Sequence, residues 1–114
     1  MDETIKPVRL KSSFGLRFFD YDEIIMIEAE GNNCMVHTKE KDKPERVLCN
    51  LAYLQKNYCK KNLYRCHKSY IINLHYIEEV LIKSREVVLR GNITARLSES
   101  CLKEIKEMFD INYQ

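Results

Sequence analysis

The chain alternates between short apolar runs and polar breaks over most of its length, and residues 92–97 show the two-residue alternation of a β-strand. Gly, Asn, Asp and Lys are frequent in the breaks, as expected for turns. The pattern predicts strands at residues 15–19, 24–29, 34–38, 45–49, 77–83, 86–90 and 93–97. Residues 63–73 are expected to be extended around a loop at residues 67–68, and residues 1–13 are either a linker or an edge strand.

Two segments instead follow the period of a helix. The first begins after Asn50, a good N-cap, and has an apolar face formed by Leu51, Leu54 and Tyr58. The second begins after Ser98 and has an apolar face formed by Leu102, Ile105 and Phe109. About eight strands that do not alternate with helices predict a mostly antiparallel β fold with one short internal helix and one C-terminal helix.

Length and composition indicate one cytoplasmic domain. A chain of 114 residues can bury a single core. It has no apolar run near the ~20 residues of a membrane span, and its first residues lack the apolar segment of a signal peptide. Its five cysteines are an odd number without a C-x-x-C pair, which favours reduced thiols in a reducing compartment.

The net charge of +2 conceals an uneven distribution, because residues 46–77 contain no Asp or Glu. The bases of this stretch are Arg46, Lys56, Lys60, Lys61, Arg65 and Lys68. It also holds five of the seven tyrosines: Tyr53, Tyr58, Tyr64, Tyr70 and Tyr76. One interpretation is a surface that faces nucleic-acid phosphates. The alternative is a small cytoplasmic protein-interaction module whose basic, tyrosine-rich face binds an acidic partner.

Three segments resemble LytTR DNA-binding domains. Residues 24–33 (IIMIEAEGNN) resemble the family's I-x-x-I-E-A-x-G-N-Y stretch, and residues 63–73 (LYRCHKSYIIN) resemble its F-x-R-x-H-R-S-Y-I-V-N signature. Residues 93–105 resemble its ending, a short strand followed by Ser-Arg and a helix. The resemblance covers about residues 16–109, in order and at the expected separations.

This resemblance implies a bacterial transcription regulator with an elongated stack of antiparallel sheets. Its loops are expected to enter successive major grooves of double-stranded DNA, at a promoter with paired repeats bound by a dimer. Family members are often response regulators of two-component systems, which carry a receiver domain that residues 1–114 do not contain. No catalytic activity, metal or cofactor is implied.

The resemblance assigns DNA contact to three loops. The first contains Asn32 and Asn33; the second contains His67, Lys68 and Ser69, with Arg65 nearby; the third contains Ser98, Ser100 and Lys103, with Arg96 before it. Three positions depart from the family pattern: Cys34 for Tyr, Lys68 for Arg and Glu99 for Arg. Either the base preference differs at Glu99, or Arg96 supplies the missing charge.

Several of these residues also have structural interpretations. His67 is either a DNA contact or a core histidine, and Arg65 either contacts DNA or forms an ion pair with an early acid such as Glu28. Asn32 and Asn33 are either contacts or turn formers. For Asn73 and Tyr70 we favour structural roles, since an Asn that ends a strand usually holds backbone groups in place.

A catalytic or metal-binding reading has little support. Adjacent residues of an extended chain point to opposite faces, so Cys66 and His67 are poorly placed to act as nucleophile and base. Cys49, Cys59, Cys66 and His67 lack the paired short spacing of structural zinc sites.

Overall fold

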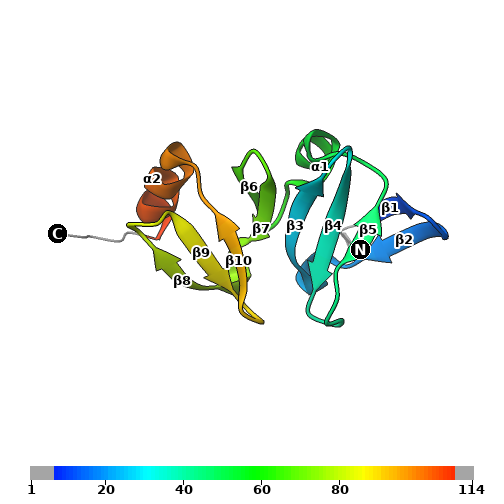
Figure 1. Cartoon of the computed structure of the whole chain (residues 1–114), viewed down its shortest axis with the longest axis horizontal. Helices are drawn as coiled ribbons and strands as arrows, with labels where there is room; N and C mark the ends of the chain where they lie inside the picture. Colours follow the sequence, from blue (N-terminus) through cyan, green and yellow to red (C-terminus); the bar gives the residue numbers. More distant parts are fainter. Residues whose placement is uncertain (1–6, 110–114) are drawn as a thin grey trace, which may run out of the picture.

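Three antiparallel sheets are stacked along the long axis of the chain, whose computed structural model describes residues 7–109 (Figure 1). The first is a hairpin of β1 (Val8–Ser12) and β2 (Gly15–Phe19). The central sheet, in the order β5-β4-β3-β7-β6, contains β3 (Ile24–Glu30), β4 (Asn33–Thr38), β5 (Glu45–Val47), β6 (Leu63–His67) and β7 (Tyr70–Asn73). The third contains β8 (Ile77–Leu81), β9 (Glu86–Leu89) and β10 (Ile93–Arg96).

The central sheet is buried on both faces, which explains the uninterrupted apolar run at its middle strand. Ile24 and Ile27 of β3 pack into one core with the hairpin and α1 (Leu51–Tyr58). Ile25 and Met26 pack into a second core with the third sheet and α2 (Glu99–Met108). A register shift between Ile24 and Met26 allows two consecutive residues to join the same core, as a β-bulge does.

Both helix starts are as predicted. The Asn50 side chain accepts a hydrogen bond from the Tyr53 amide at 2.8 Å, and the Ser98 hydroxyl accepts one from the Cys101 amide at 3.1 Å. The predicted apolar face of the second helix is partly wrong. Ile105 is fully buried, but Phe109 follows the last helical residue and is 49% exposed.

The strand predictions are confirmed with small differences at the ends. Ten strands form within residues 7–109, more than the eight or so expected, because residues 8–12 are a strand and residues 63–73 form two. The strands predicted at residues 45–49 and 77–83 end earlier, at Val47 and Leu81. Residues 1–6 of the predicted linker or edge strand lie outside the described residues. No helix within residues 7–109 has the length and hydrophobicity to cross a bilayer.

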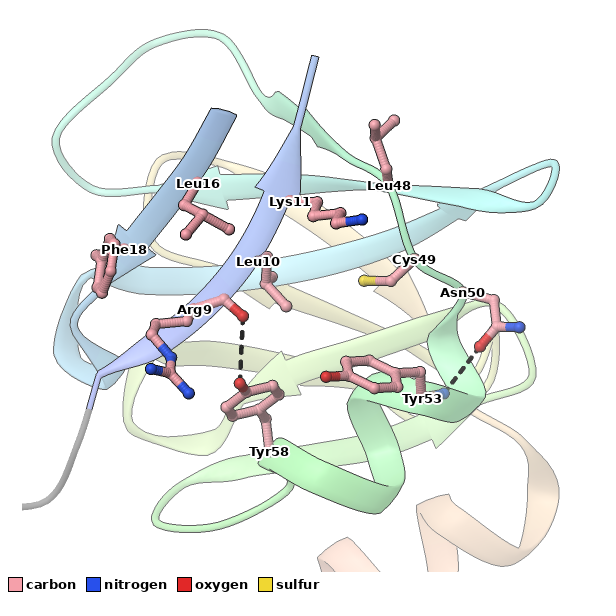
Figure 2. Close-up of a pocket in the computed structure, with 10 residues that line it drawn as sticks. All are labelled: Arg9, Leu10, Lys11, Leu16, Phe18, Leu48, Cys49, Asn50, Tyr53 and Tyr58. Carbon is pink, nitrogen blue, oxygen red and sulfur yellow. Dashed lines mark hydrogen bonds between the residues drawn. The ribbon is translucent and has the colours of Figure 1, made fainter. Parts of the chain in front are cut away.

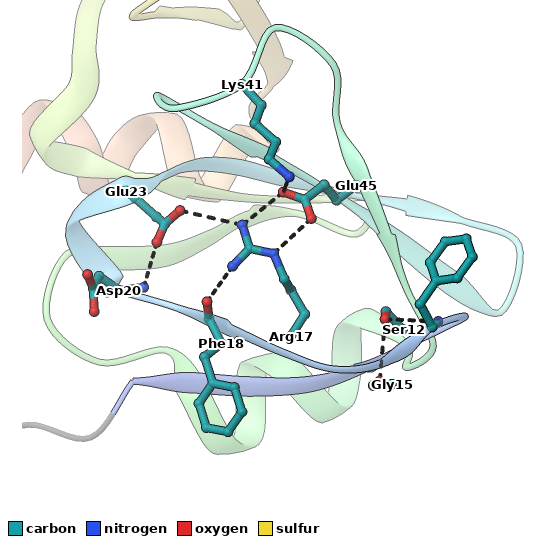
Figure 3. Close-up of polar contacts among 9 residues, drawn as sticks. Ser12, Gly15, Arg17, Phe18, Asp20, Glu23, Lys41 and Glu45 are labelled. Atoms are coloured by element: carbon teal, nitrogen blue, oxygen red, sulfur yellow. Dashed lines mark hydrogen bonds and ion pairs between the residues drawn. The ribbon is translucent and has the colours of Figure 1, made fainter.

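An ion-pair network holds the hairpin against the central sheet (Figure 3). The Arg17 guanidinium donates to both carboxylate oxygens of Glu45, at 2.8 and 2.9 Å, and lies 3.7 Å from Glu23. Lys41 approaches Glu45 at 3.4 Å. The hydrogen bonds from Arg17 hold the pKa of Glu45 below its ordinary value. Arg17 therefore points inward, whereas its neighbours Leu16 and Phe18 are exposed.

Asn73, at the end of β7, has the structural role expected from the sequence. It is 3% exposed, and its amide nitrogen donates to the carbonyls of Ile24 at 2.8 Å and Tyr21 at 3.3 Å. Its side-chain oxygen accepts from the His75 amide at 2.9 Å, which caps an unpredicted 3₁₀ turn at Leu74–Tyr76. One side chain thus ties the end of the central sheet to the start of β3.

Candidate nucleic-acid interface

The three predicted loops lie at one edge of the molecule. β3 and β6 both pair antiparallel with β7, so they run parallel to each other and their following turns share an edge (Figure 1). The Ala29 amide donates to the Ser69 carbonyl at 2.9 Å, and the Ser98 amide donates to the Cys66 carbonyl at 2.9 Å. These bonds fix the turns and the start of α2 relative to one another. We call residues 31–33, 67–69 and 96–103 the contact edge.

The first turn of the contact edge is tight. Gly31 has a φ of +61°, which a residue without Cβ adopts at low cost. Asn32 is exposed, whereas Asn33 is half-buried and already pairs with Glu30 in the β3–β4 ladder. Cys34, which departs from the family pattern, is fully buried, and burial raises its pKa to about 12. That substitution therefore changes the core and not the contact edge.

Arg65 shapes the second turn from within the protein. Its guanidinium donates to the carbonyls of His67 at 3.2 Å and Lys68 at 2.7 Å. It also donates to the Gln55 side chain on α1 at 2.8 Å. The ion pair with Glu28 considered above is wrong. Glu28 lies 2.7 Å from the His37 ring nitrogen instead.

Gln55 was missed by the sequence reasoning. An exposed polar residue on a helix carries no pattern that distinguishes it from its neighbours. Only the packing of α1 beside β6 brings its side chain to Arg65.

The two ring nitrogens of His67 have different roles. Its Nδ1 accepts a hydrogen bond from the Ser69 amide at 3.1 Å, so the neutral ring carries its proton on Nε2. The ring is half-buried, with its centroid 5.6 Å from that of Tyr70. Lys68 is exposed at the tip and Ser69 is half-buried. His67 thus stabilises the turn through one nitrogen and has the second as a donor.

The third segment is the start of α2. Arg96, Ser100 and Lys103 are exposed and Ser98 is half-buried. The Ser98 hydroxyl lies 3.4 Å from that of Ser100 and is committed to the helix cap. The first amides of a helix have no intrahelical acceptor and attract anions. Glu99 occupies this first turn, where a carboxylate interacts favourably with the helix dipole.

Two thiols link β6 to β10 and to α2. Cys66 donates to the Arg96 carbonyl at 3.3 Å, and Cys101 donates to the Arg65 carbonyl at 3.5 Å. Burial raises the pKa of Cys66 to about 12, so the thiol is protonated at neutral pH and is a poor nucleophile. Within residues 7–109, no group of three or more His, Cys, Asp or Glu side chains is arranged to hold a metal ion.

The five tyrosines of residues 46–77 do not form one face, so that part of the composition argument is wrong. Tyr76 is buried and donates to the Asp22 carbonyl, and Tyr64 donates to Glu104. Tyr58 donates to the Arg9 carbonyl at 3.2 Å, on the other side of the central sheet. Tyr53 is the one classed as exposed, at 47%.

The environment of His67 makes stability depend on pH. Burial lowers the pKa of His67, and three neighbouring cations lower it further: Arg96, Lys68 and Arg65. The folded state therefore binds a proton less readily than the unfolded chain, whose His titrates near pH ~6.5. The stabilising contribution is present above that pH and is lost as pH falls below it. Between about pH 7.5 and 5.5, we expect the urea midpoint of wild type to fall further than that of His67→Asn.

His75→Asn is the matched control, because His75 is an exposed histidine outside the contact edge. It should follow the wild-type pH profile. Equal slopes for wild type and His67→Asn would show that His67 does not produce the effect.

Comparison with known proteins places these features in a family. A sequence profile described as "LytTr DNA-binding domain" matches residues 15–110. The chain is 35% identical over 48 residues to the transcriptional regulatory protein BtsR of Escherichia coli K12 and of Shigella flexneri. That alignment covers 40% of this chain and 20% of each relative, so the chain matches about a fifth of their length.

The fold also matches a solved structure, described as a LytTr DNA-binding domain from Bacillus cereus. The TM-score is 0.74, with 17% sequence identity, over 93% of this chain and 98% of that chain. The predicted stack of antiparallel sheets with two helices is therefore confirmed.

Proposed function

Because the chain belongs to the LytTR DNA-binding domain family, we propose that it binds double-stranded DNA sequence-specifically, with its contact edge in successive major grooves. The family is one of DNA-binding domains and not of enzymes, and the BtsR relatives are described as transcriptional regulators. DNA binding in transcription regulation follows from this membership. The sequence-specific, groove-reading mode is our proposal.

The proposal rests on one observation. Three loops that are distant in sequence lie at one edge of the molecule, where backbone hydrogen bonds link them to one another. Such bonds fix the loops in one arrangement before DNA arrives, which reduces the ordering cost of binding. The longest extent of the molecule is 49 Å. Successive major grooves on one side of a duplex recur every ~34 Å, so a single copy can span two of them.

The side chains divide into two roles. Arg96, Lys103, Ser100 and Ser69 supply phosphate contacts, with the first amides of α2, and provide most of the affinity. Asn32, Asn33, His67 and Lys68 supply donors and acceptors for base edges and provide discrimination. Arg65 and Ser98 are positioning residues. The Arg65 guanidinium holds the second turn, and the Ser98 hydroxyl caps α2.

The same family membership supports a wider proposal. We expect two copies to bind paired repeats as a dimer in the bacterial cytoplasm. We also expect residues 1–114 to act as one DNA-binding unit, either alone or in a longer chain with a receiver domain.

Replacing Lys68 with alanine should weaken binding to the preferred duplex by about 1–3 kcal/mol and relax discrimination at one base pair. The reason is that Lys68 is exposed at the tip of the second turn, where its ammonium can donate to a base edge. Fluorescence anisotropy with the preferred duplex and single-base variants measures both effects. Lys60→Ala, which removes an exposed cation outside the contact edge, should retain discrimination.

Other outcomes assign Lys68 differently. Equal weakening on all duplexes, with a salt slope smaller by about one unit, would make Lys68 a phosphate contact. No loss on any duplex would remove it from the interface.

The interaction-module alternative predicts weak, sequence-blind DNA binding. Retention on heparin alone does not distinguish the two functions, because any basic surface is retained. Elution from heparin by the preferred duplex, but not by a scrambled duplex of equal length, supports the proposed function. Equal elution by both duplexes contradicts it.

A further inference from the structure

A groove outside the contact edge lies on the outer face of the β1–β2 hairpin, beside α1 (Figure 2). It has a volume of about 560 Å³. Its lining combines apolar, aromatic and basic side chains: Arg9, Leu10, Lys11, Leu16, Phe18, Leu48, Cys49, Asn50, Tyr53 and Tyr58. None of these residues belongs to the contact edge.

The apolar character of this face follows from strand alternation. On β2, Arg17 and Phe19 point inward, so Leu16 and Phe18 point outward and are 65% and 50% exposed. Across the groove, Leu48 and Tyr53 are 41% and 47% exposed. Four large exposed hydrophobic side chains thus line one concave surface. Exposed apolar residues gathered in this way, unlike single ones, mark interaction surfaces.

The charges at this groove have one sign. The strand register places Lys11 opposite Leu16 and Arg9 opposite Phe18, so two cations share the outer face with the two apolar side chains. Among residues 7–109, no acidic side chain lines the groove. Glu23 and Glu45, near the same hairpin, are held on its inner side by Arg17. A complementary surface therefore presents apolar side chains together with carboxylates.

The backbone of β1 restricts how such a partner can bind. The Arg9 carbonyl accepts from the Tyr58 hydroxyl at 3.2 Å, and the Lys11 carbonyl accepts from the Leu48 amide at 2.8 Å. The carbonyls of Arg9 and Lys11 therefore already accept hydrogen bonds within the chain. A partner must then dock through its side chains, and not by adding a strand beside β1.

We infer that this groove docks an acidic, amphipathic segment of a partner protein. Its apolar side chains cover Leu16, Phe18, Leu48 and Tyr53, and its carboxylates pair with Arg9 and Lys11. DNA is a poor occupant, because phosphates would leave the leucine and phenylalanine side chains uncovered. The inference goes beyond DNA binding: separate surfaces allow the chain to hold a protein segment and a duplex at once.

The test pans a phage-displayed library of random peptides against the full chain in the absence of DNA. Enriched peptides should combine Leu, Ile or Phe with Asp or Glu. Synthetic copies should bind Leu16→Ser/Phe18→Ser at least ~10-fold more weakly, which corresponds to about 1.4 kcal/mol. Both sites are solvent-exposed, so this variant is expected to fold. Met108→Ser, which removes an exposed apolar side chain on α2, is the control and should bind as wild type does.

Reversing the charges of Arg9 and Lys11 tests whether these two cations select the acidic peptides. Panning against Arg9→Glu/Lys11→Glu should enrich basic peptides in place of acidic ones. The inference is overturned if wild type enriches neutral or basic peptides, if nothing enriches, or if the selected peptides bind the serine variant equally well. It is also overturned if wild type forms a dimer that Phe18→Ser disperses, because a second copy would then occupy the groove.

The same variants separate this inference from the proposed function. Leu16→Ser/Phe18→Ser should retain wild-type affinity for the preferred duplex. Failure of peptide binding with intact duplex binding removes only the docking site, whereas failure of duplex binding by wild type removes only the proposed function.

Discussion

Replacing Asn73 with aspartate should lower the free energy of unfolding by about 3 kcal/mol or more. Aspartate retains the shape of the side chain and the acceptor for the His75 amide. It removes the two hydrogen bonds that Asn73 donates to the carbonyls of Tyr21 and Ile24, and it buries a carboxylate facing them. An uncompensated buried charge is among the most costly single changes in a protein. Urea denaturation monitored by circular dichroism measures the loss.

The control for this change is Asn62→Asp, because Asn62 is exposed in the turn before β6. A surface substitution of this kind is expected to stay within about 0.5 kcal/mol of wild type. If Asn73→Asp were equally mild, the two hydrogen bonds that Asn73 donates would not be a stabilising link between the end of β7 and the start of β3. Asn73 lies at the end of β7 opposite the contact edge, so the folded fraction of the variant should bind DNA normally.

Replacing Arg65 with lysine should weaken binding to the preferred duplex by roughly a hundredfold, or about 3 kcal/mol, although the charge is kept. The planar guanidinium reaches three acceptors at once, and an ammonium cannot reproduce that fork. Two of the acceptors are carbonyls of the second turn. Without them, His67, Lys68 and Ser69 lose their fixed arrangement. Anisotropy measures the affinity, and the amide resonance of Ser69 reports the turn.

Arg46→Lys provides the comparison for this substitution. Arg46 forms a half-exposed ion pair with Glu30 at 3.0 Å, and such surface pairs contribute little. Its replacement should change affinity by less than about threefold. If Arg65→Lys behaved the same way, the second turn would not depend on the guanidinium, and Arg65 would not be a positioning residue.

Local patterns were sufficient to predict most of the secondary structure. The helix starts at Asn50 and Ser98 depend on one side chain and an amide three residues later, so the sequence reveals them directly. The strands are short and bounded by turn residues, which sets their positions to within a few residues. The 3₁₀ turn at Leu74–Tyr76 was missed because it depends on Asn73, whose own orientation is fixed by distant carbonyls.

The features that depend on strand order were not predictable from local patterns. An ion pair with an early acid such as Glu28 was one of two interpretations of Arg65. Its guanidinium instead donates to the carbonyls of His67 and Lys68, next to a register shift between Arg65 and His67. The tyrosines are close in sequence yet distributed over two cores, because the central sheet separates them: Tyr58 of α1 packs on one face, and Tyr64, Tyr70 and Tyr76 pack on the other. The resemblance to a family identified the three loops, and the parallel course of β3 and β6 explains why they share an edge.

The contact edge and the groove on the hairpin follow from the same layered architecture. The central sheet has both faces covered, so its turns are left for recognition at the edge. The hairpin is an outer layer, covered on its inner face alone, and its outer face carries Leu16 and Phe18 into solvent. Recognition of DNA and of a protein segment can therefore be changed independently by substitutions in the two places.

The most direct test of the central claim is selection from a library of randomised duplexes, followed by anisotropy titration of the enriched duplexes across salt concentrations. We expect a paired-repeat motif to be enriched. We also expect the logarithm of the binding constant to fall linearly with the logarithm of salt concentration, with a slope that corresponds to several phosphates. Uniform affinity of ~10⁻⁴–10⁻⁶ M for all duplexes, without enrichment, would contradict sequence-specific DNA recognition by this chain.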